Sequence, residues 1–282
     1  MRDLRFQIGD SRLEIRDCAM PLDLSQFAAV LLDLDGTIYH EDRVLPGAVE
    51  LVGRLEAMEV KYACLSNSVS SPAEVRLRLT GMGIDIAEHH IYTAAAAAAD
   101  YVLERYGPGG RIFNLSTGGV QRMLEGRVRW VQGPDEACDA VIAGHPLCEY
   151  ATEQRQRWAV ALLRGGAELV GICADRVYPS PRGLELGSGA MCAMLAYAAD
   201  VRPTFCGKPE AKFFLSLCRR LGVSPQQCVL IGDNVESDVA GARRVGMKSI
   251  LTLTGVVRRE DLDRLPADLQ PDGVVEDLRE LA

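Results

Sequence analysis

Short apolar runs and helical patterns alternate along the chain. Residues 27–32 and 228–231 are unbroken apolar runs, which is typical of parallel strands that are covered on both faces. Apolar side chains, Val49 among them, recur at helical spacing between residues 46 and 58, and a strand is predicted at residues 60–65. Two strands that are joined by a helix pair in parallel through a right-handed crossover. The pattern therefore predicts an α/β fold with a Rossmann-like parallel sheet and helices on both faces.

A second α/β segment is predicted between residues 91 and 203. Thr93 stands where a helix cap is expected, the alanine run 94–99 follows it, and Gly-Pro-Gly-Gly at 107–110 ends the helix. Three further strands are predicted, at residues 111–115, 140–143 and 168–173. We therefore predict a discontinuous core domain of residues 1–90 and 204–282 that is interrupted by an inserted α/β domain of residues 91–203.

Local signals predict smaller features. Ser71-Pro72-Ala73-Glu74 and Ser224-Pro225-Gln226-Gln227 have the pattern of capping boxes, which start helices. Residues 4–16 alternate between apolar and polar around Gly9-Asp10-Ser11 and predict a β-hairpin, for which the sequence offers no role. A helix is predicted at residues 239–245, closed by Gly246.

Composition narrows the class of protein. With 282 residues, 48% of them hydrophobic, the chain is long enough to bury a sizeable core. Aromatic residues make up only 6% and the formal net charge is −8, so the sequence argues against a protein that binds nucleic acid through stacked bases or a basic face. Any phosphate that the protein binds must then be held by a few nearby side chains or backbone groups, and not by a large basic surface.

The sequence also suggests a compartment. Residues 1–5 carry charges where a signal peptide would need an apolar core, and no apolar run approaches the roughly 20 residues of a membrane span. We expect a cytoplasmic protein that does not bind membranes. The nine cysteines, Cys18 among them, are odd in number and contain no Cys-x-x-Cys pair, which favours reduced structural thiols over disulfides or zinc.

Two acids follow the first apolar strand. Asp33 is expected to end the strand, while Gly36 lets the chain turn so that Asp35 bends back toward the same ligand. This geometry suits a nucleophile paired with an acid/base, and two close carboxylates favour a proton or a divalent cation between them and their neighbours. The alternative is a turn whose aspartates only accept backbone hydrogen bonds.

Polar residues also follow three other predicted strands. If the strands are parallel, all four loops converge on one edge of the sheet. Carboxylates suit Mg²⁺ together with a substrate phosphate, a hydroxyl and backbone amides suit the phosphate oxygens, and an ammonium offsets their charge. Taken singly, each residue is more simply explained by turn, cap or solvent contacts, so the argument rests on their joint occurrence. The residues are Asp33 and Asp35, Ser66 and Asn67, Lys208, and Asp233 and Asp238.

In this order the motifs resemble those of the haloacid dehalogenase-like superfamily of aspartate-nucleophile phosphatases. The matching segments are Asp33-x-Asp35-Gly36-Thr37, Ser66-Asn67, Gly207-Lys208-Pro209 and Gly232-Asp233-x4-Asp238. An inserted domain between the second and third motifs resembles the C2-capped branch. Within that branch, the chain looks similar to the subgroup of N-acetylglucosamine-6-phosphate, nucleotide and pyridoxal phosphate phosphatases.

The resemblance implies a role for each motif. Asp33 would attack phosphorus to form an aspartyl-phosphate, and Asp35 would protonate the leaving alcohol and later accept a proton from water. The implied ligands of Mg²⁺ are Asp33, the backbone carbonyl of Asp35, and Asp233. Ser66, Asn67 and Lys208 would hold the phosphoryl group. Asp238 would orient Lys208 or a metal-bound water from outside the ligand set.

The inserted domain departs from the family pattern. Relatives commonly have Ala-Thr-Asn-x-Asp where this chain has Ile172-Cys173-Ala174-Asp175 after Gly171, so only the aspartate is kept, and His145 stands where an aspartate is frequent. We expect Asp175, Arg176, Arg182 and His145 to contact the substrate. For both arginines the alternative is a solvated surface, and for His145 a surface or core role.

The sequence therefore predicts a Mg²⁺-dependent phosphatase for a small soluble phosphate monoester, such as a sugar phosphate, a nucleotide, a glycerol phosphate or pyridoxal phosphate. Two alternatives stay open. One is a phosphometabolite-binding or regulatory protein with weak turnover, and the other is a phosphotransferase or phosphomutase. The substrate and the oligomeric state are not evident from the sequence, although the alanine helix and the strands of the inserted domain offer surfaces for a homo-oligomer.

Overall fold

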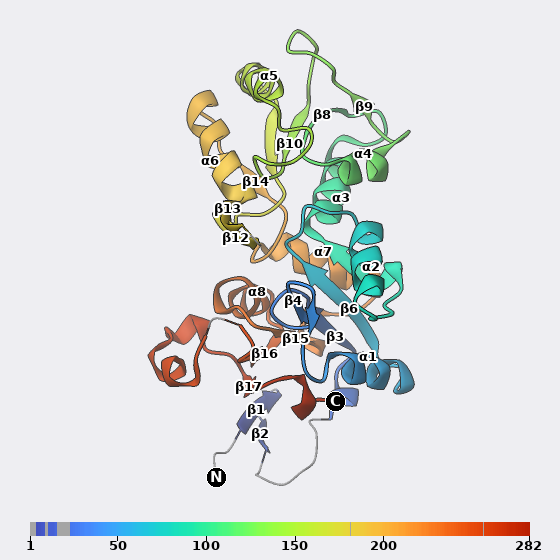
Figure 1. Ribbon diagram of the computed structural model, residues 1–282, viewed down its shortest axis with the longest axis vertical. Coiled ribbons are helices and arrows are strands. Elements are labelled where there is room, and N and C mark those ends of the chain that lie inside the picture. The colour runs from blue at the N-terminus through green and yellow to red at the C-terminus, as the bar shows by residue number, and fades with distance from the viewer. Residues whose placement is uncertain (1–3, 9–10, 16–22, 181, 256) are drawn as a thin grey trace. The chain divides into compact units, whose positions relative to one another are not determined.

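The computed structural model describes residues 4–8, 11–15, 23–180, 182–255 and 257–282 (Figure 1). The chain forms two compact units. The first contains Met1–Ser66, Arg76–Ile91 and Pro209–Ala282, and the second contains Asn67–Val75 and Tyr92–Lys208. Each unit is built around its own sheet.

The first unit contains a six-stranded sheet. Its strands lie in the order β17 (Gly273–Val275), β16 (Lys248–Thr252), β15 (Cys228–Gly232), β3 (Ala29–Asp33), β6 (Lys61–Ser66) and β7 (Ile91–Thr93). The pairings from β17 to β6 are all parallel. Every residue of β3 and β15 is buried, as the unbroken apolar runs predict.

Amphipathic helices cover this sheet. Helix α1 (Ala48–Ala57) buries Leu51, Val52 and Leu55, while Val49, predicted on its apolar face, is 49% exposed. The remaining helices in this part of the chain are α2 (Pro72–Gly81), α7 (Ala211–Leu221) and α8 (Ala240–Val245), which follows a π-helical turn at Val235–Val239. Short 3₁₀ turns occur at Leu24–Gln26, Glu88–His90, Pro225–Gln227, Arg259–Arg264, Ala267–Leu269 and Leu278–Glu280. The predicted parallel α/β core is confirmed.

Two antiparallel ribbons accompany the first sheet. β1 (Leu4–Ile8) pairs with β2 (Ser11–Ile15) and lies beside β17, which confirms the predicted N-terminal hairpin (Figure 1). Gly9 and Asp10 of its turn lie outside the described residues, as do residues 1–3 and Cys18. The second ribbon, β4 (Tyr39–His40) with β5 (Arg43–Val44), follows the acidic loop after β3.

The second unit is an α/β unit with a five-stranded parallel sheet. The strand order is β14 (Thr204–Phe205), β11 (Glu168–Gly171), β10 (Ala140–Ala143), β8 (Arg111–Leu115) and β9 (Arg129–Trp130). Its helices are α3 (Ala94–Tyr106), α4 (Gly118–Leu124), α5 (Glu153–Arg164) and α6 (Ser188–Ala199), and β12 (Val177–Ser180) and β13 (Gly183–Leu186) form a hairpin. The alanines at 94–99 are all buried within the chain, which removes the alanine run as a surface for a second copy.

Helix caps confirm one of the two predicted capping boxes. The backbone N–H of Ser71 donates to Glu74 Oε2 (2.8 Å), and that of Glu74 donates to Ser71 Oγ (3.3 Å). The box predicted at Ser224 is wrong, because its side chain makes no capping bond. Instead the N–H of Gln227 donates to the Ser224 carbonyl (3.0 Å) and closes a single 3₁₀ turn that runs directly into β15.

Among the described residues, no helix is long and apolar enough to cross a membrane. The eight described cysteines are free thiols, and all except Cys138 are buried.

The start of α1 gives a test of this packing. Gly47 has φ +82°, and a Cβ there would lie 2.3 Å from the backbone nitrogen of Arg279. We expect Gly47→Ala to lower the free energy of unfolding by about 2 to 5 kcal/mol, because it adds left-handed strain to a backbone clash. Chemical denaturation measures this change.

Gly53 in the same helix is the matched control, since a Cβ there has no atom within 4 Å. Gly53→Ala should raise the free energy of unfolding by about 0.5 to 1 kcal/mol. Equal effects of the two substitutions would contradict the close approach at Gly47.

Candidate active site

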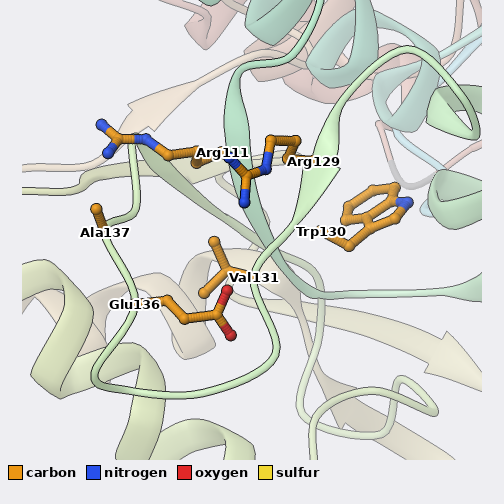
Figure 2. A pocket seen from close by; sticks show the side chains of 6 residues that line it. All are labelled: Arg111, Arg129, Trp130, Val131, Glu136 and Ala137. Carbon is orange, nitrogen blue, oxygen red and sulfur yellow. The ribbon is translucent and has the colours of Figure 1, made fainter.

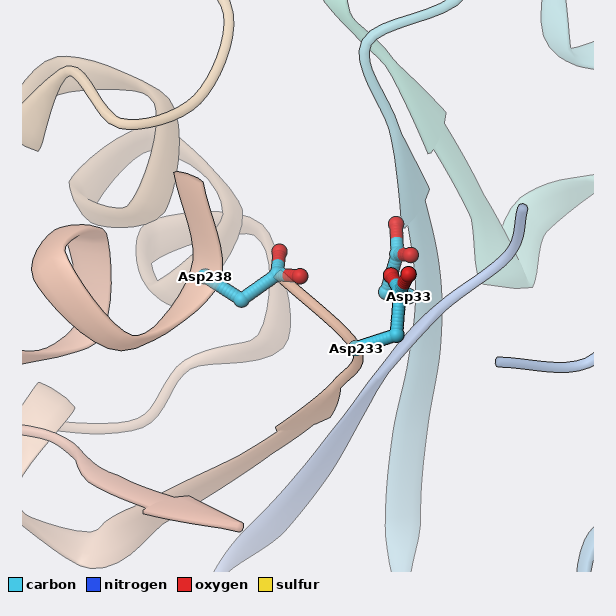
Figure 3. A group of neighbouring side chains, drawn as sticks. All are labelled: Asp33, Asp233 and Asp238. Carbon is cyan, nitrogen blue, oxygen red and sulfur yellow. The ribbon is translucent and has the colours of Figure 1, made fainter. Parts of the chain in front are cut away.

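Three carboxylates meet at the carboxyl ends of two neighbouring strands. Asp33 is the last residue of β3, and Asp233 follows the last residue of β15, its parallel neighbour. Asp238 joins them from the π-helical turn, and one carboxylate oxygen of each residue lies within 4.8 Å of the others (Figure 3). The sequence predicted the first two acids together and placed Asp238 outside the set of ligands.

The π-helical turn explains how Asp238 reaches this group. Asn234 caps the turn, since its Oδ1 accepts from the N–H groups of Glu236 (2.9 Å) and Ser237 (3.0 Å). The Asn234 N–H in turn donates to Asp238 Oδ2 (3.2 Å). A Cβ on Gly232 would lie 2.5 Å from the same oxygen, so glycine is required where the strand ends. Asp238 is therefore buried and fixed in place.

Two glycines leave the space that the carboxylate of Asp233 occupies. A Cβ on Gly36 would lie 2.3 Å from Asp233 Oδ2, and one on Gly255 would lie 2.0 Å from it. Gly36 also has φ +88°, which favours glycine on conformational grounds. The hydroxyl of Thr254 donates to the Gly36 carbonyl (2.5 Å) and fixes this turn. Gly36 thus both turns the chain directly after Asp35 and leaves room for Asp233.

Asp33 and Asp35 lie in different environments. Asp33 is buried, and the hydroxyl of Thr37 donates to its Oδ2 (3.5 Å). The side chain of Asp35 is 51% exposed, and its Oδ1 lies 3.9 Å from Nδ1 of His40. A fixed, buried acid beside an accessible one suits a nucleophile and a proton donor. His40 was not singled out in the sequence, because the short ribbon that returns it to Asp35 has no strong pattern.

A thiol nucleophile is excluded at this strand end. Cys64 lies on β6, next to β3, and is fully buried. Burial, reinforced by the negative charge of Asp33, raises its pKa well above the usual range. Cys64 therefore stays a neutral thiol at physiological pH.

The donor atoms fit a divalent cation of the magnesium type. Oxygens of Asp33, Asp233 and Asp238 are hard ligands, and three carboxylates within 4.8 Å repel one another. A divalent cation relieves that repulsion better than a single proton, because it neutralises more than one charge. The arrangement can thus bind a metal ion beside a phosphate.

Ser66 lies at the same sheet edge as Asp33. It is the last residue of β6, and Asp33 pairs with Leu65, one residue earlier. The structure therefore brings together Asp33, Ser66 and Asp233, as predicted from parallel strands.

Lys208 follows a strand of the other sheet, so the shared edge of the first sheet does not account for its place, and its part in the site stays a prediction. β14 pairs in parallel with β11 in the second unit, with Phe205 opposite Gly171. A Cβ on Gly171 would lie 2.6 Å from the ring of Phe205, so this glycine admits the ring and lets the two strands pair. A strand of two residues gives too weak a pattern for its sheet to be assigned from the sequence.

In the second unit, Lys208 is bound to Asn67 through its backbone. Its N–H donates to Asn67 Oδ1 (2.7 Å), and its carbonyl accepts from Asn67 Nδ2 (3.1 Å). The same Nδ2 donates to both oxygens of Asp175, at 3.0 and 3.2 Å. Lys208 is only 4% exposed. These three residues form one connected group.

The other predicted substrate contacts have different surroundings. Arg182 forms an ion pair with Glu185 (2.9 Å), although its side chain is 76% exposed. His145 packs against Tyr178, its Nδ1 accepts from the N–H of Leu147 (3.2 Å), and burial lowers its pKa. Arg176 is exposed. Pro181, in the loop between β12 and β13, lies outside the described residues.

A pocket of about 210 Å³ also opens beside β9 in the second unit (Figure 2). Its lining residues are Arg111, Arg129, Trp130, Val131, Glu136 and Ala137. It contains none of the predicted site residues, so it is not the candidate active site.

Comparison with known proteins places the chain in a family. A family model described as haloacid dehalogenase-like hydrolase matches residues 30–127, and a second, HAD-hydrolase-like model matches residues 205–281. Haloacid dehalogenase-like hydrolase domain-containing protein 2 of Bos taurus is 35% identical over 84% of this chain and 88% of its own length. Acid sugar phosphatase of Staphylococcus aureus is 31% identical over 85% of this chain and 91% of its own.

A solved structure extends the likeness to the fold. The glycerol phosphate phosphatase of Mycobacterium tuberculosis, in complex with magnesium, has a TM-score of 0.81 and 27% identity, and the match covers 91% of this chain and 76% of that one. Together with the parallel α/β core and the acids at its strand ends, these matches show that the chain belongs to the haloacid dehalogenase-like hydrolases and is a phosphatase of their C2-capped branch.

Proposed function

We propose that this phosphatase depends on Mg²⁺ and hydrolyses a small phosphate monoester through an aspartyl-phosphate on Asp33. The observation that carries the proposal is the group of Asp33, Asp233 and Asp238, whose carboxylate oxygens lie within 4.8 Å of one another, with Asp35 in the loop after β3. The magnesium complex of the glycerol phosphate phosphatase gives it support.

The residues proposed to hold the cation are Asp33, Asp233 and the backbone carbonyl of Asp35, with Asp238 added by its place in the cluster. When bound there, Mg²⁺ offsets the negative charge of the phosphate and of the carboxylates around it. The sequence predicted that Asp238 orients Lys208 or a metal-bound water. Because its carboxylate oxygen lies within 4.8 Å of those of Asp33 and Asp233, we propose it as a ligand as well.

In the first step, an Asp33 oxygen forms a bond to phosphorus as the bond between phosphorus and the leaving oxygen breaks. Asp35, in its acid form, gives its proton to that oxygen, and the alcohol leaves. In the second step a water attacks phosphorus, Asp35 takes a proton from it, and the bond between phosphorus and Asp33 breaks. Inorganic phosphate leaves, and both acids return to their starting states.

The remaining motif residues are proposed to bind the phosphoryl group. The Ser66 hydroxyl and the backbone N–H of Asn67 lie next to each other in the chain and suit the non-bridging oxygens, while the Lys208 ammonium offsets their charge. These groups act on the part that every phosphate monoester shares, so they serve the reaction and not the choice of substrate.

We assign the choice of leaving group to the inserted domain predicted at residues 91–203, and the reaction to the core predicted at 1–90 and 204–282. The substrate is proposed to be a sugar phosphate, a nucleotide, a glycerol phosphate or pyridoxal phosphate. The names of two relatives, acid sugar phosphatase and glycerol phosphate phosphatase, favour sugar and glycerol phosphates within this set.

Replacing the nucleophile gives the first test. Asp33→Asn should reduce kcat for p-nitrophenyl phosphate by more than about 10³-fold, because an amide does not attack phosphorus. The variant should stay folded and melt at a higher temperature than the wild type in EDTA, since one of three like charges is gone. Full turnover by this folded variant would exclude the aspartyl-phosphate route.

A second test separates the role of Asp35 from that of Asp33. Asp35→Asn should lower kcat/KM for glycerol 3-phosphate by about 10²- to 10⁴-fold, since the leaving alkoxide needs a proton. The loss for p-nitrophenyl phosphate should be smaller, because nitrophenolate leaves without one. Asp42→Asn, in the exposed turn between β4 and β5, is the control and should change neither value. An equal loss with both substrates would argue against a general acid at Asp35.

A third test concerns the metal. EDTA should stop turnover and added Mg²⁺ should restore it. In Asp238→Asn the Mg²⁺ concentration for half-maximal activity should rise at least about tenfold, with kcat largely recovered at saturation. If Asp238 only orients Lys208, kcat falls while this concentration stays unchanged. Turnover that persists in EDTA would contradict the metal requirement.

A further inference from the structure

Asp175 was predicted to contact the substrate, but its carboxylate accepts from the side chain of Asn67 within the second unit. We propose that Asp175 is a positioning residue: it fixes the amide of Asn67 and, through it, the backbone of Lys208. The inference rests on the proposed function for its effect on catalysis, and its geometry stands on hydrogen bonds inside one compact unit.

The amide of Asn67 is fully used. One hydrogen of Nδ2 donates to the Lys208 carbonyl (3.1 Å), and the other faces the Asp175 carboxylate (3.0 Å). Oδ1 accepts from the Lys208 N–H (2.7 Å). The side chain thus pairs with both backbone groups of Lys208 as a neighbouring peptide would, and it holds that residue at two points.

Asp175 favours the same orientation of the Asn67 amide as the backbone of Lys208 does. An amide rotated by a half-turn would place Oδ1 against a carboxylate and Nδ2 against an N–H, so each of its bonds would become a repulsion. A charged acceptor also binds an N–H more strongly than a neutral one. Asp175 therefore stabilises the one orientation in which Asn67 can hold Lys208.

Asp175 is itself held firmly. The N–H of Gly189, at the start of α6, donates to the Asp175 carbonyl (2.9 Å), and a Cβ on Gly187 would lie 2.2 Å from that carbonyl oxygen. Gly207 completes the arrangement, since a Cβ there would lie 2.6 Å from Asn67 Oδ1. The glycine of the Gly207-Lys208-Pro209 motif is thus needed for the close approach of Asn67.

The kind of activity loss distinguishes positioning from substrate contact. The backbone N–H of Asn67 and the ammonium of Lys208 are proposed to act on the phosphoryl group, which all substrates share. A residue that acts through them should affect all substrates by the same factor. A residue that contacts the leaving group should affect substrates with different leaving groups by different factors.

The test compares kcat/KM of Asp175→Ala with p-nitrophenyl phosphate, glycerol 3-phosphate and glucose 6-phosphate. We expect a loss of roughly 10- to 100-fold, the same within about threefold for each substrate, as for a lost hydrogen bond to a charged group. Asp175→Asn keeps an oxygen acceptor and should restore most of the activity. The control Asp135→Ala replaces an exposed turn aspartate of the same unit and should leave all three values unchanged.

A double-mutant cycle tests the route of action. If Asp175 acts through Asn67, adding Asp175→Ala to Asn67→Ala should cost no more than about twofold, whereas independent roles give multiplied losses. Losses that differ between substrates, or that multiply in the cycle, would overturn the inference while leaving the phosphatase activity of the wild type intact.

Hydrogen exchange gives a readout that does not need turnover. The backbone N–H of Lys208 should exchange faster in Asp175→Ala than in the wild type, and at the wild-type rate in Asp135→Ala, with melting temperatures confirming that both variants are folded. Unchanged protection at Lys208 would refute the positioning role. Absence of phosphatase activity in the wild type would instead refute the proposed function, and the exchange result would still decide the role of Asp175.

Discussion

Repulsion between three carboxylates is the main physical constraint on the loops at the strand ends of the first unit. Oxygens of Asp33, Asp233 and Asp238 lie within 4.8 Å of one another at the ends of two buried strands. Like charges at this separation destabilise the folded chain unless a cation accompanies them. The Asn234 N–H donates to Asp238 and the Thr37 hydroxyl donates to Asp33, and both bonds offset part of this repulsion. A cation bound among the three acids, as proposed for Mg²⁺, would offset this repulsion further.

Backbone shape, more than side-chain chemistry, keeps these acids together. The parallel pairing of β3 with β15 aligns the ends of the two strands, and the π-helical turn brings Asp238 back toward them. Gly36 and Gly255 leave space on either side of Asp233 that any other residue would fill. A glycine in the first motif thus serves an acid of the fourth motif, which explains why the motif Asp-x-Asp-Gly-Thr must be understood together with Gly-Asp.

The sequence predicts those parts of the fold that local pattern determines. The apolar runs at β3 and β15 fill parallel central strands, and such runs have few other stable positions. The Ser71 capping box was predicted for the same reason, because its hydrogen bonds lie within four residues. The box at Ser224 was not realised, since the next residues are taken up by β15 after one turn. Local pattern is reliable where no neighbouring element competes for the same residues.

The features that the sequence did not predict depend on contacts between distant residues. β14 can pair with β11 because Gly171, opposite Phe205, has no side chain that would clash with the ring. A strand of two residues is too short for its pattern to predict this pairing. His40 comes near Asp35 only through the turn of a short ribbon. The second motif is divided between the units, with Ser66 in the first and Asn67 in the second. A sequence motif is therefore not a structural unit here.

The structure shows the surroundings of residues 172–175, the segment of the inserted domain that departs from the family pattern. Cys173, which departs from the family pattern, is buried, so its substitution changes the core and not a surface that a substrate meets. Asp175, which keeps the pattern, is bound to Asn67. If Asp175 positions Asn67 for every substrate, we expect Asp175 to be kept even where the neighbouring residues change. Arg176, the next residue along the chain, is exposed, whereas Cys173 is buried.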